Sequence, residues 1–317
     1  MEQQQQKTIL ITGGETLVGK RLTRHLLRQG YEVLWLGGTS RMRAQQAPDT
    51  LPWDWEQGIV SIEALERADI VIHLEGANLL DARWTSEHMR HIVRSRIVSA
   101  KVLLDALAKL TDGKGRTFIC ASSIYYYGLE TSRDWLTEQS EAGADFLAQT
   151  FGLLEERVAH WGAMARVRTV ALRHGFILDE LGGGLHNMLL PIRLHLITPL
   201  GKGNQYINWI HIEDLCRIYQ QAIVQPQMVG AYNACSVAPL TNEQFASALS
   251  VAQFGYLVPP IKVAISSKIL RTAIGPRAHY LLRGRPVSVD KLLDTGFLFR
   301  FNSLNQALRD LKLSAIS

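Results

Sequence analysis

Residues 8–19 read T-I-L-I-T-G-G-E-T-L-V-G. The apolar run at 8–12 predicts a short buried strand, and the spacing of Val18, Leu22 and Leu26 by four predicts a helix directly after it. A turn between a parallel strand and a helix N-terminus favours phosphate, because free backbone N–H groups and the helix dipole both point at it. The stretch therefore predicts a dinucleotide-binding βαβ unit.

One position of this turn departs from the usual glycine pattern. T-G-x-x-G-x-x-G would place its middle glycine at position 16, where the chain has Thr16. A β-branched residue held at positive φ would cost about 1–2 kcal/mol. Two alternatives remain open: Thr16 adopts ordinary dihedral angles and caps the helix, or its hydroxyl binds a phosphate oxygen. A degenerate site kept only as a turn is the opposing interpretation. We predict a retained dinucleotide contact through Gly13, Gly14, Thr16, Leu17, Val18 and Gly19.

Composition narrows the classes of protein to which the chain can belong. The 317 residues are 47% hydrophobic and 20% charged, and the net charge of +5 is not gathered into a dense Lys/Arg block. The three cysteines form no CxxC motif, so we expect buried reduced thiols and no metal site. The N-terminus lacks a signal-peptide core, and no apolar run approaches about 18 residues. We expect a soluble cytoplasmic protein with a small-molecule substrate and neither nucleic-acid nor membrane partners.

Strands and helices alternate through the first half of the chain. Strands are predicted at 32–36, 69–74, 117–121 and 168–173, and helices at about 86–109 and 146–161. Thr85 or Ser86 is the expected cap of the first of these helices. This order implies right-handed crossovers and an α/β fold, a doubly wound parallel sheet of Rossmann type.

The pattern changes after about residue 178. Gly182, Gly183 and Gly184 interrupt it, and helix-like runs follow at 185–196 and 212–223, with several prolines further on. We therefore expect a dinucleotide-binding domain over 1–178 and a smaller, mostly helical substrate lobe over 179–317. Segments at about 205–235 are expected to return to the main sheet.

A series of separated motifs carries a resemblance to a known family. In chain order they are the glycine turn, W-D-W-E-Q-G at 53–58, D-I-V-I-H-L-E-G-A-N at 69–78, R-W-T at 83–85, S-R at 95–96, A-S-S-I-Y-Y-Y-G at 121–128, L-R-H-G-F-I-L at 172–178, G-G-G-L-H-N-M-L-L-P at 182–191, G-K-G-N-Q-Y-I-N-W-I-H-I-E-D-L at 201–215 and D-T-G-F-L-F at 294–299. Together they resemble the atypical extended short-chain dehydrogenase/reductases, in the NADP-binding epimerase-family group. The resemblance covers nearly all of the chain.

The resemblance implies a cofactor site at the carboxyl ends of the strands. NAD-type sites place an acidic residue after the second strand, whereas this chain has Ser40 and Arg41 there and no carboxylate, which favours NADP. Leu74, Glu75 and Gly76 follow the third predicted strand, where the family's backbone passes the cofactor. Glu75 replaces a small residue, and a carboxylate beside a pyrophosphate is unfavourable unless it points away. Further expected cofactor contacts are Ser122, Arg173 and Gly175.

The catalytic residues typical of the superfamily are only partly present. Ser123 stands where its serine belongs, but alignment on Glu155 places Leu147 and Phe151 at the Tyr and Lys positions. Tyr127 is the candidate replacement acid, the alternative being that Tyr125, Tyr126 and Tyr127 pack the edge of the sheet. A tyrosine near its ordinary pKa of about 10 is a poor base at neutral pH.

The resemblance also suggests residues that border a substrate cleft: Arg83, Gln205, Trp209 and His211. Arg83 has the alternative of capping the long helix, and His211 that of a structural histidine. Two functions remain open, an NADP(H)-dependent oxidoreductase or epimerase acting on a small or sugar-like substrate, and a non-catalytic NADP(H)-binding sensor or regulatory protein. In a third, Thr16 and Glu75 abolish dinucleotide binding and another ligand takes the pocket.

Overall fold

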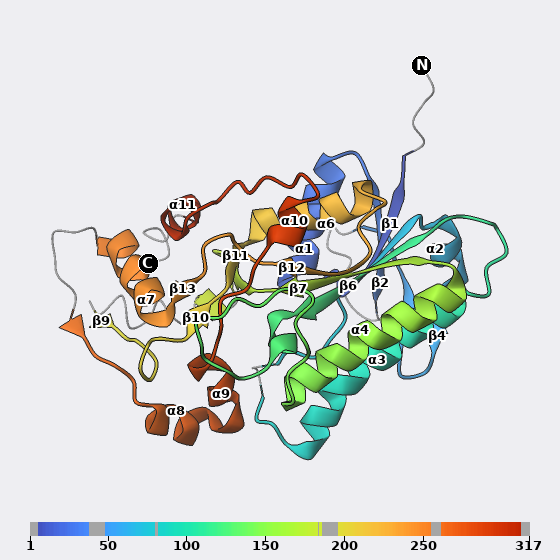
Figure 1. The fold of residues 1–317 in the computed structure, drawn as a ribbon. Coiled ribbons are helices and arrows are strands. Elements are labelled where there is room, and N and C mark those ends of the chain that lie inside the picture. Colours follow the sequence, from blue (N-terminus) through green and yellow to red (C-terminus); the bar gives the residue numbers. More distant parts are fainter. Residues whose placement is uncertain are drawn as a thin grey trace.

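The computed structural model describes residues 6–37, 48–79, 82–182, 184–185, 196–254 and 261–311. Its centre is an eight-stranded sheet with the order β12-β7-β6-β5-β1-β2-β3-β4 (Figure 1). Neighbouring strands are parallel except for β3 and β4. The strands are β1 (Thr8–Thr12), β2 (Glu32–Gly37), β3 (Thr50–Asp54), β4 (Ile59–Val60), β5 (Ile70–His73), β6 (Thr117–Ser123), β7 (Arg168–His174) and β12 (Gly230–Ala234).

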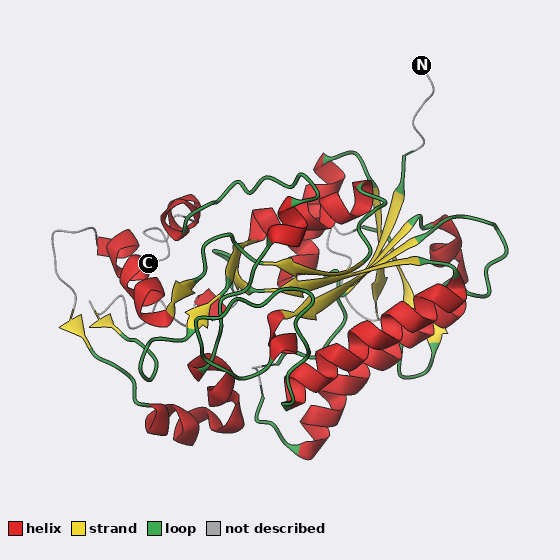
Figure 2. Cartoon of the chain, viewed as in Figure 1, coloured by secondary structure: helices red, strands yellow, loops and turns green. Residues whose placement is uncertain are grey.

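Helices cover both faces of this sheet. Helices α1 (Leu17–Arg28) and α6 (Ile212–Val224) pack together on one face, and α3 (Ser86–Leu107) packs against α4 (Phe146–Ala165) on the other (Figures 1 and 2). Chain order runs outward from β1 through β2 and β3, and then from β5 through β6 and β7 on the other side of β1. The sheet is therefore doubly wound, as predicted, with its switch point between β1 and β5.

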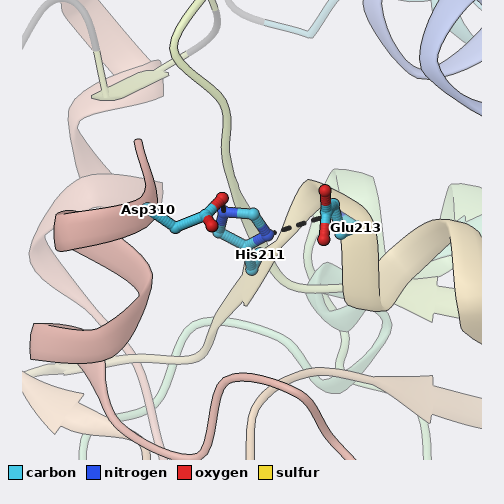
Figure 3. Close-up of side chains that lie close together, drawn as sticks. All are labelled: His211, Glu213 and Asp310. Carbon is cyan, nitrogen blue, oxygen red and sulfur yellow. Dashed lines mark hydrogen bonds and ion pairs between the residues drawn. The ribbon is translucent and has the colours of Figure 1, made fainter. Parts of the chain in front are cut away.

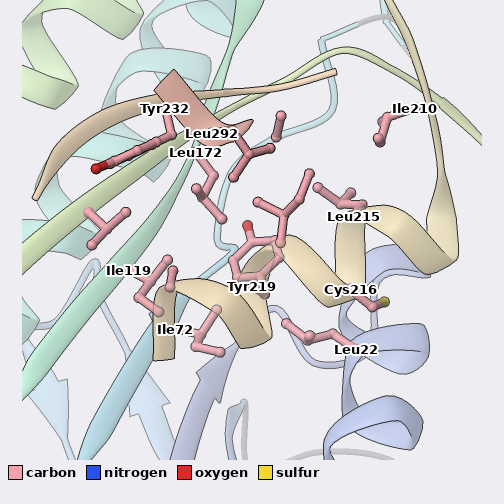
Figure 4. Packing of buried hydrophobic residues seen from close by; sticks show 14 of the residues in the cluster. Leu22, Ile72, Ile119, Leu172, Ile210, Leu215, Cys216, Tyr219, Tyr232 and Leu292 are labelled. Atoms are coloured by element: carbon pink, nitrogen blue, oxygen red, sulfur yellow. The ribbon is translucent and has the colours of Figure 1, made fainter. Parts of the chain in front are cut away.

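The two faces have separate hydrophobic cores because successive residues of a strand point to opposite sides. Ile9 and Ile11 of β1 belong to the core under α1 and α6, whereas Leu10 belongs to the core under α3 and α4. Figure 4 shows the first core around the fully buried Tyr219 of α6, with Leu22 of α1 beside it. Burial on both faces explains why β1 reads as a continuous apolar run.

Helix caps fix the starts of two helices that frame the carboxyl edge of the sheet. The Thr85 hydroxyl accepts a hydrogen bond from the backbone N–H of His88 at the start of α3, so Thr85 rather than Ser86 is the cap. The Asp145 carboxylate accepts from the backbone of Leu147 and Ala148 at the start of α4. Both starts agree with the sequence prediction.

Strands β3 and β4 and helix α2 of the main domain were not predicted from the sequence. Strand β3 contains Pro52, and a proline within a short run argues against a strand. Helix α2 (Ile62–Arg67) has only 6 residues, too few for a clear helical period. The helix expected at 185–196 lies mostly outside the described residues, and Leu196 begins strand β9 (Leu196–Ile197) instead.

The remaining elements form a lobe at the carboxyl edge of the sheet (Figure 2). Its helices are α7 (Asn242–Phe254), α8 (Ser267–Ile274), α9 (Ala278–Leu282) and α11 (Leu304–Asp310), whereas α10 (Asp290–Leu293) packs against β12 of the main sheet. Short strand pairs join β8 (Phe176–Leu178) to β11 (Trp209–His211), β10 (Tyr206–Ile207) to β13 (Leu240–Thr241), and β9 to β14 (Ile261–Lys262). Strand β12 returns to the main sheet, as the sequence predicted, whereas the domain boundary near residue 178 stays a prediction.

Candidate functional site

The turn between β1 and α1 has the geometry of an anion site despite its threonine. Thr16 has φ −67° and ψ 166°, which are ordinary extended angles. Its hydroxyl accepts from the backbone N–H of Gly19 at 3.1 Å and donates to the carbonyl of Gly13 at 2.7 Å. The capping alternative is therefore confirmed, and the hydroxyl hydrogen is already used within the turn.

Three glycines let this turn pack closely. Gly13 has φ +67°, and a Cβ there would lie 3.1 Å from the carbonyl carbon of Leu74. A Cβ on Gly14 would lie 2.4 Å from the Trp35 ring, and one on Gly19 would lie 2.3 Å from the Gly13 carbonyl oxygen. In the part of the chain that the structure describes, the backbone N–H groups of Leu17 and Val18 donate no hydrogen bond. These free donors at the start of α1 suit a diphosphate.

The segment after β5 packs directly against this turn, at Leu74 and Glu75. A Cβ on Gly76 would lie 2.9 Å from the guanidinium carbon of Arg96, a partly buried cation on α3. Arg96 donates to the carbonyls of Ala77 at 2.8 Å and Ile92 at 2.9 Å, and burial lowers its pKa to about 10. The sequence analysis noted this arginine only as part of a motif. Its position beside Glu75 could not be read from the chain.

A buried polar network occupies the other end of the carboxyl edge, at β6, β7 and α4. Arg173 donates to Glu155 through Nε at 2.9 Å and Nη2 at 2.7 Å, and the Ser122 hydroxyl donates to the same carboxylate at 2.5 Å. Arg173 also donates to the Tyr127 hydroxyl at 2.8 Å, and its guanidinium lies 3.4 Å from the centre of the Tyr126 ring. Ser122 and Arg173, which are predicted to contact the cofactor, are therefore hydrogen-bonded to the same Glu155 carboxylate.

Tyr127 is held at both sides of its hydroxyl. It accepts from Arg173 and donates to the Asn233 side chain at 2.7 Å. Burial raises the pKa of Tyr127 well above its ordinary value, although Arg173 lowers it. This geometry favours the packing alternative over the predicted acid. The Tyr125 hydroxyl, by contrast, makes no hydrogen bond among the described residues, and burial raises its pKa to about 12.

Helix α4 carries no acid or base where the superfamily's Tyr and Lys would stand. Leu147 and Phe151 are 0% and 3% exposed and belong to the core under this helix. Tyr280 of α9 closes the helix start, since its hydroxyl accepts from the Leu147 N–H and donates to Asp145 at 2.6 Å. Ser123 accepts from the Tyr125 N–H at 3.3 Å, and its own hydroxyl donates to none of the residues that the structure describes.

Two residues predicted to border the cleft are buried anchors of the lobe. The indole of the fully buried Trp209 donates to the Ala238 carbonyl at 2.8 Å. The Gln205 amide donates to the carbonyls of Leu281 and Leu200 at 2.9 and 3.1 Å. These contacts hold the lobe together, so the geometry lends no support to a substrate contact, which stays a prediction.

The other expected site residues take varied positions. Arg83 is exposed just ahead of α3, where contact with an anionic substrate remains open. Gly175 is required by packing, since a Cβ there would lie 2.2 Å from the Asn208 carbonyl oxygen. Ser40, Arg41 and Gly183 lie outside the described residues.

His211 belongs to a cluster with Glu213 and Asp310 that offers three potential metal ligands (Figure 3). Its Nδ1 accepts from the backbone N–H of Glu213 at 3.2 Å, so the neutral ring carries its hydrogen on Nε2, 3.5 Å from Asp310. Burial lowers the pKa of His211, and the Glu213 carboxylate is paired with Arg300 at 2.6 Å. A ring nitrogen that carries hydrogen cannot bind a metal. The cluster therefore suits a structural histidine, whose ring packs on Phe301 with centroids 3.9 Å apart.

Asp214, in the first turn of α6, binds the backbone of the segment that precedes α11. Its carboxylate accepts from the backbone N–H groups of Arg300 at 2.9 Å and Phe301 at 3.0 Å.

The cysteines Cys120, Cys216 and Cys235 are buried and unpaired, as predicted. Within the described ranges, no helix combines the length and apolar character needed to cross a membrane.

A doubly wound sheet with a glycine turn at its switch point defines the Rossmann class of dinucleotide-binding folds. The model of the NAD dependent epimerase/dehydratase family matches residues 9–150, and that of a domain of unknown function, DUF1731, matches residues 266–311. The mouse epimerase family protein SDR39U1 is 31% identical over 95% of this chain and 98% of its own length. The Mycobacterium tuberculosis epimerase family protein MT2273 is 33% identical over 95% and 96%. The chain belongs to this epimerase family.

The solved structures include one of a relative with a cofactor. The crystal structure of human SDR39U1 with NADPH has a TM-score of 0.80 and 27% identity, covering 96% of this chain and 98% of that one. The nucleoside-diphosphate sugar epimerase of Corynebacterium glutamicum has a TM-score of 0.74 and 26% identity, covering 98% of this chain and 59% of that one.

Proposed function

We propose that this protein binds NADPH at the β1–α1 turn and the adjoining segment after β5. The observation that carries the proposal is the turn itself, in which Thr16 keeps extended angles and the N–H groups of Leu17 and Val18 remain free. The likeness to a human relative solved with NADPH supports the same conclusion. Preference for NADPH over NADH rests on the sequence after β2, which has Ser40 and Arg41 and no carboxylate.

Two roles are compatible with a bound NADPH. The first is an oxidoreductase or epimerase-like enzyme of the cytoplasm acting on a small or sugar-like substrate, in which NADPH supplies hydride. Ser123, whose hydroxyl donates to none of the described residues, would orient the substrate oxygen in that role. The family membership favours this candidate.

The second role is a non-catalytic NADPH-binding sensor or regulatory protein. It is favoured by the buried Leu147 and Phe151 on α4 and by the Tyr127 hydroxyl, which Arg173 and Asn233 hold on both sides. Without a positioned acid, hydride transfer to a carbonyl loses a proton-transfer contribution of about 10²–10⁴-fold.

Titration of the purified protein with NADPH and with NADH, followed by cofactor fluorescence, tests the proposal. Saturable binding of NADPH with weaker binding of NADH is expected. A flat titration with both cofactors would remove the proposal. A turnover assay across carbonyl compounds and nucleotide sugars then separates the two roles, because only the enzyme oxidises NADPH.

A further inference from the structure

Glu75 lies directly beside the proposed diphosphate site. Its backbone nitrogen would be 3.4 Å from a Cβ on Gly13, so the segment after β5 touches the glycine turn. The side chain is partly buried. Among the residues that the structure describes, none forms an ion pair or a hydrogen bond of normal geometry with its carboxylate. A partly buried carboxylate without such a partner is an unusual neighbour for an anion site.

The groups around Glu75 come from three other elements. Glu15 approaches from the β1–α1 turn, Arg96 from α3 and Trp53 from β3. Burial and then Glu15 raise the pKa of Glu75, and the Trp53 indole and Arg96 offset this only in part. The indole N–H faces the carboxylate without completing a hydrogen bond.

Arg96 does not neutralise this carboxylate by a direct contact. Its two terminal nitrogens donate to the carbonyls of Ile92 and Ala77 instead. A diphosphate at the turn would therefore add two negative charges next to Glu15 and Glu75, with one partly buried cation held away from them. Like charges repel more strongly where water is partly excluded.

Resting on the proposed NADPH binding, we propose that Glu75 takes up a proton when the dinucleotide binds, so that cofactor affinity falls as the pH rises. The diphosphate disfavours the ionised carboxylate, so the bound state holds the proton to a higher pH than the free protein does. Between the pKa of Glu75 in the free protein and its higher pKa in the complex, each unit rise in pH weakens binding about tenfold, since one proton is taken up per dinucleotide. Below the pKa of the free protein, Glu75 is neutral in both states and the pH dependence disappears.

The test compares wild type with Glu75→Gln, which keeps the size of the side chain and removes its charge. NADP⁺ is the probe, because it carries the same diphosphate as NADPH and withstands acid. Isothermal titration calorimetry from pH 5 to 8.5, in buffers of different ionisation enthalpy, gives both the dissociation constant and the number of protons taken up. The 2′-phosphate also titrates, with a second pKa of about 6, but it does so in both proteins and cancels in their ratio.

We expect Glu75→Gln to bind NADP⁺ about tenfold or more tightly than wild type at pH 8, with the difference shrinking as the pH falls. Wild type should take up close to one more proton than the variant near neutral pH. Glu75→Asp should keep the pH dependence, and Glu15→Gln should weaken it without removing it. Thermal unfolding of each variant shows that it is folded.

The outcomes separate this inference from the function on which it rests. If neither wild type nor Glu75→Gln binds NADP⁺ at any pH, the proposed function fails. If both bind with the same affinity and the same proton count throughout, the proposed function stands and the inference is overturned. Binding by both proteins at neutral pH, tighter for Glu75→Gln and with the difference closing as the pH falls, supports both.

Discussion

The two ends of the carboxyl edge differ in whether the backbone or side chains supply their polar groups. At the β1–α1 turn, the donors are backbone N–H groups placed by Gly13, Gly14 and the Thr16 cap. At β6 and β7, the polar groups are side chains, and Arg173 with Glu155 ties them into a closed network. The first end presents free donors, whereas the second satisfies its donors internally.

The difference teaches which sequence changes a site tolerates. A threonine replaces a glycine at the turn without strain, because its angles are extended and the amides that follow keep their directions. On α4, Leu147 and Phe151 stand where the superfamily has its Tyr and Lys, and neither side chain can move a proton. A site made of backbone survives substitutions that erase one made of side chains.

The largest expected effect comes from opening the closed network. Arg173→Met leaves the buried Glu155 carboxylate without its cation and should lower the free energy of unfolding by about 3–5 kcal/mol. Urea denaturation measures this. The double variant Arg173→Met with Glu155→Gln should recover part of the loss. A loss below about 1 kcal/mol in the single variant would show that the network is not what holds this end together.

Lowering the pH should destabilise the protein through two histidines of the sheet, His73 and His174. Burial lowers the pKa of His73 and of His174 to about 4, below the unfolded value of about 6.5. A lowered pKa means that the folded protein holds these rings neutral, so their stabilisation is complete above pH 6.5 and is lost as the pH falls towards 4. Each histidine should contribute a slope of up to about 1.4 kcal/mol per pH unit in that window.

Unfolding of His73→Gln between pH 7 and 5 checks this assignment. The glutamine amide can still hydrogen-bond with Thr12 and Ser99, which contact the His73 ring at 2.9 and 3.1 Å. The variant should lose less stability than wild type over this range. Gln in place of the exposed His160 is the control and should follow wild type. Equal slopes for all three proteins would refute the role of His73.

Tyr127 and Tyr125 offer a matched pair at the side-chain end. Tyr127→Phe leaves Arg173 Nη1 and the side-chain oxygen of Asn233 without the hydroxyl they share and should cost about 1–3 kcal/mol of stability, with NADPH affinity changed less than about threefold. Tyr125→Phe should cost less, because its hydroxyl makes no hydrogen bond among the described residues. If Tyr127→Phe instead keeps full stability and abolishes a measured turnover, Tyr127 is the acid and the packing interpretation is wrong.

The smallest effects are expected at the backbone end. Thr16→Ala loses the cap on Gly19 and should cost about 1 kcal/mol, whereas Thr16→Gly should cost a few tenths. NADPH affinity should change less than about threefold in both, since the amides that bind remain. Thr16→Ser is the control that keeps the cap. A large gain in affinity for Thr16→Gly would mean that the threonine obstructs the diphosphate.

The sequence predicted the fold because local signals agree with the global one. Apolar spacing within residues 8–26 predicted strand β1 and helix α1, with the glycine turn between them. The capping of α1 by Thr16 was one of two predicted alternatives. Strand β3 was not, because Pro52 hides it.

The candidate site was less predictable because its contacts join residues far apart in the chain. Neither the tie between Tyr127 and Asn233 nor that between His211 and Asp310 leaves a local pattern. Arg96 beside Glu75 is a further example, since only the fold brings α3 to the end of β5.

Hydrogen–deuterium exchange with and without saturating NADP⁺ tests the central claim most directly. The account predicts slower exchange in the peptide spanning residues 13–19, where the N–H groups of Leu17 and Val18 would acquire phosphate acceptors. Unchanged exchange there, with NADP⁺ shown to be bound, would contradict the account and place the dinucleotide elsewhere.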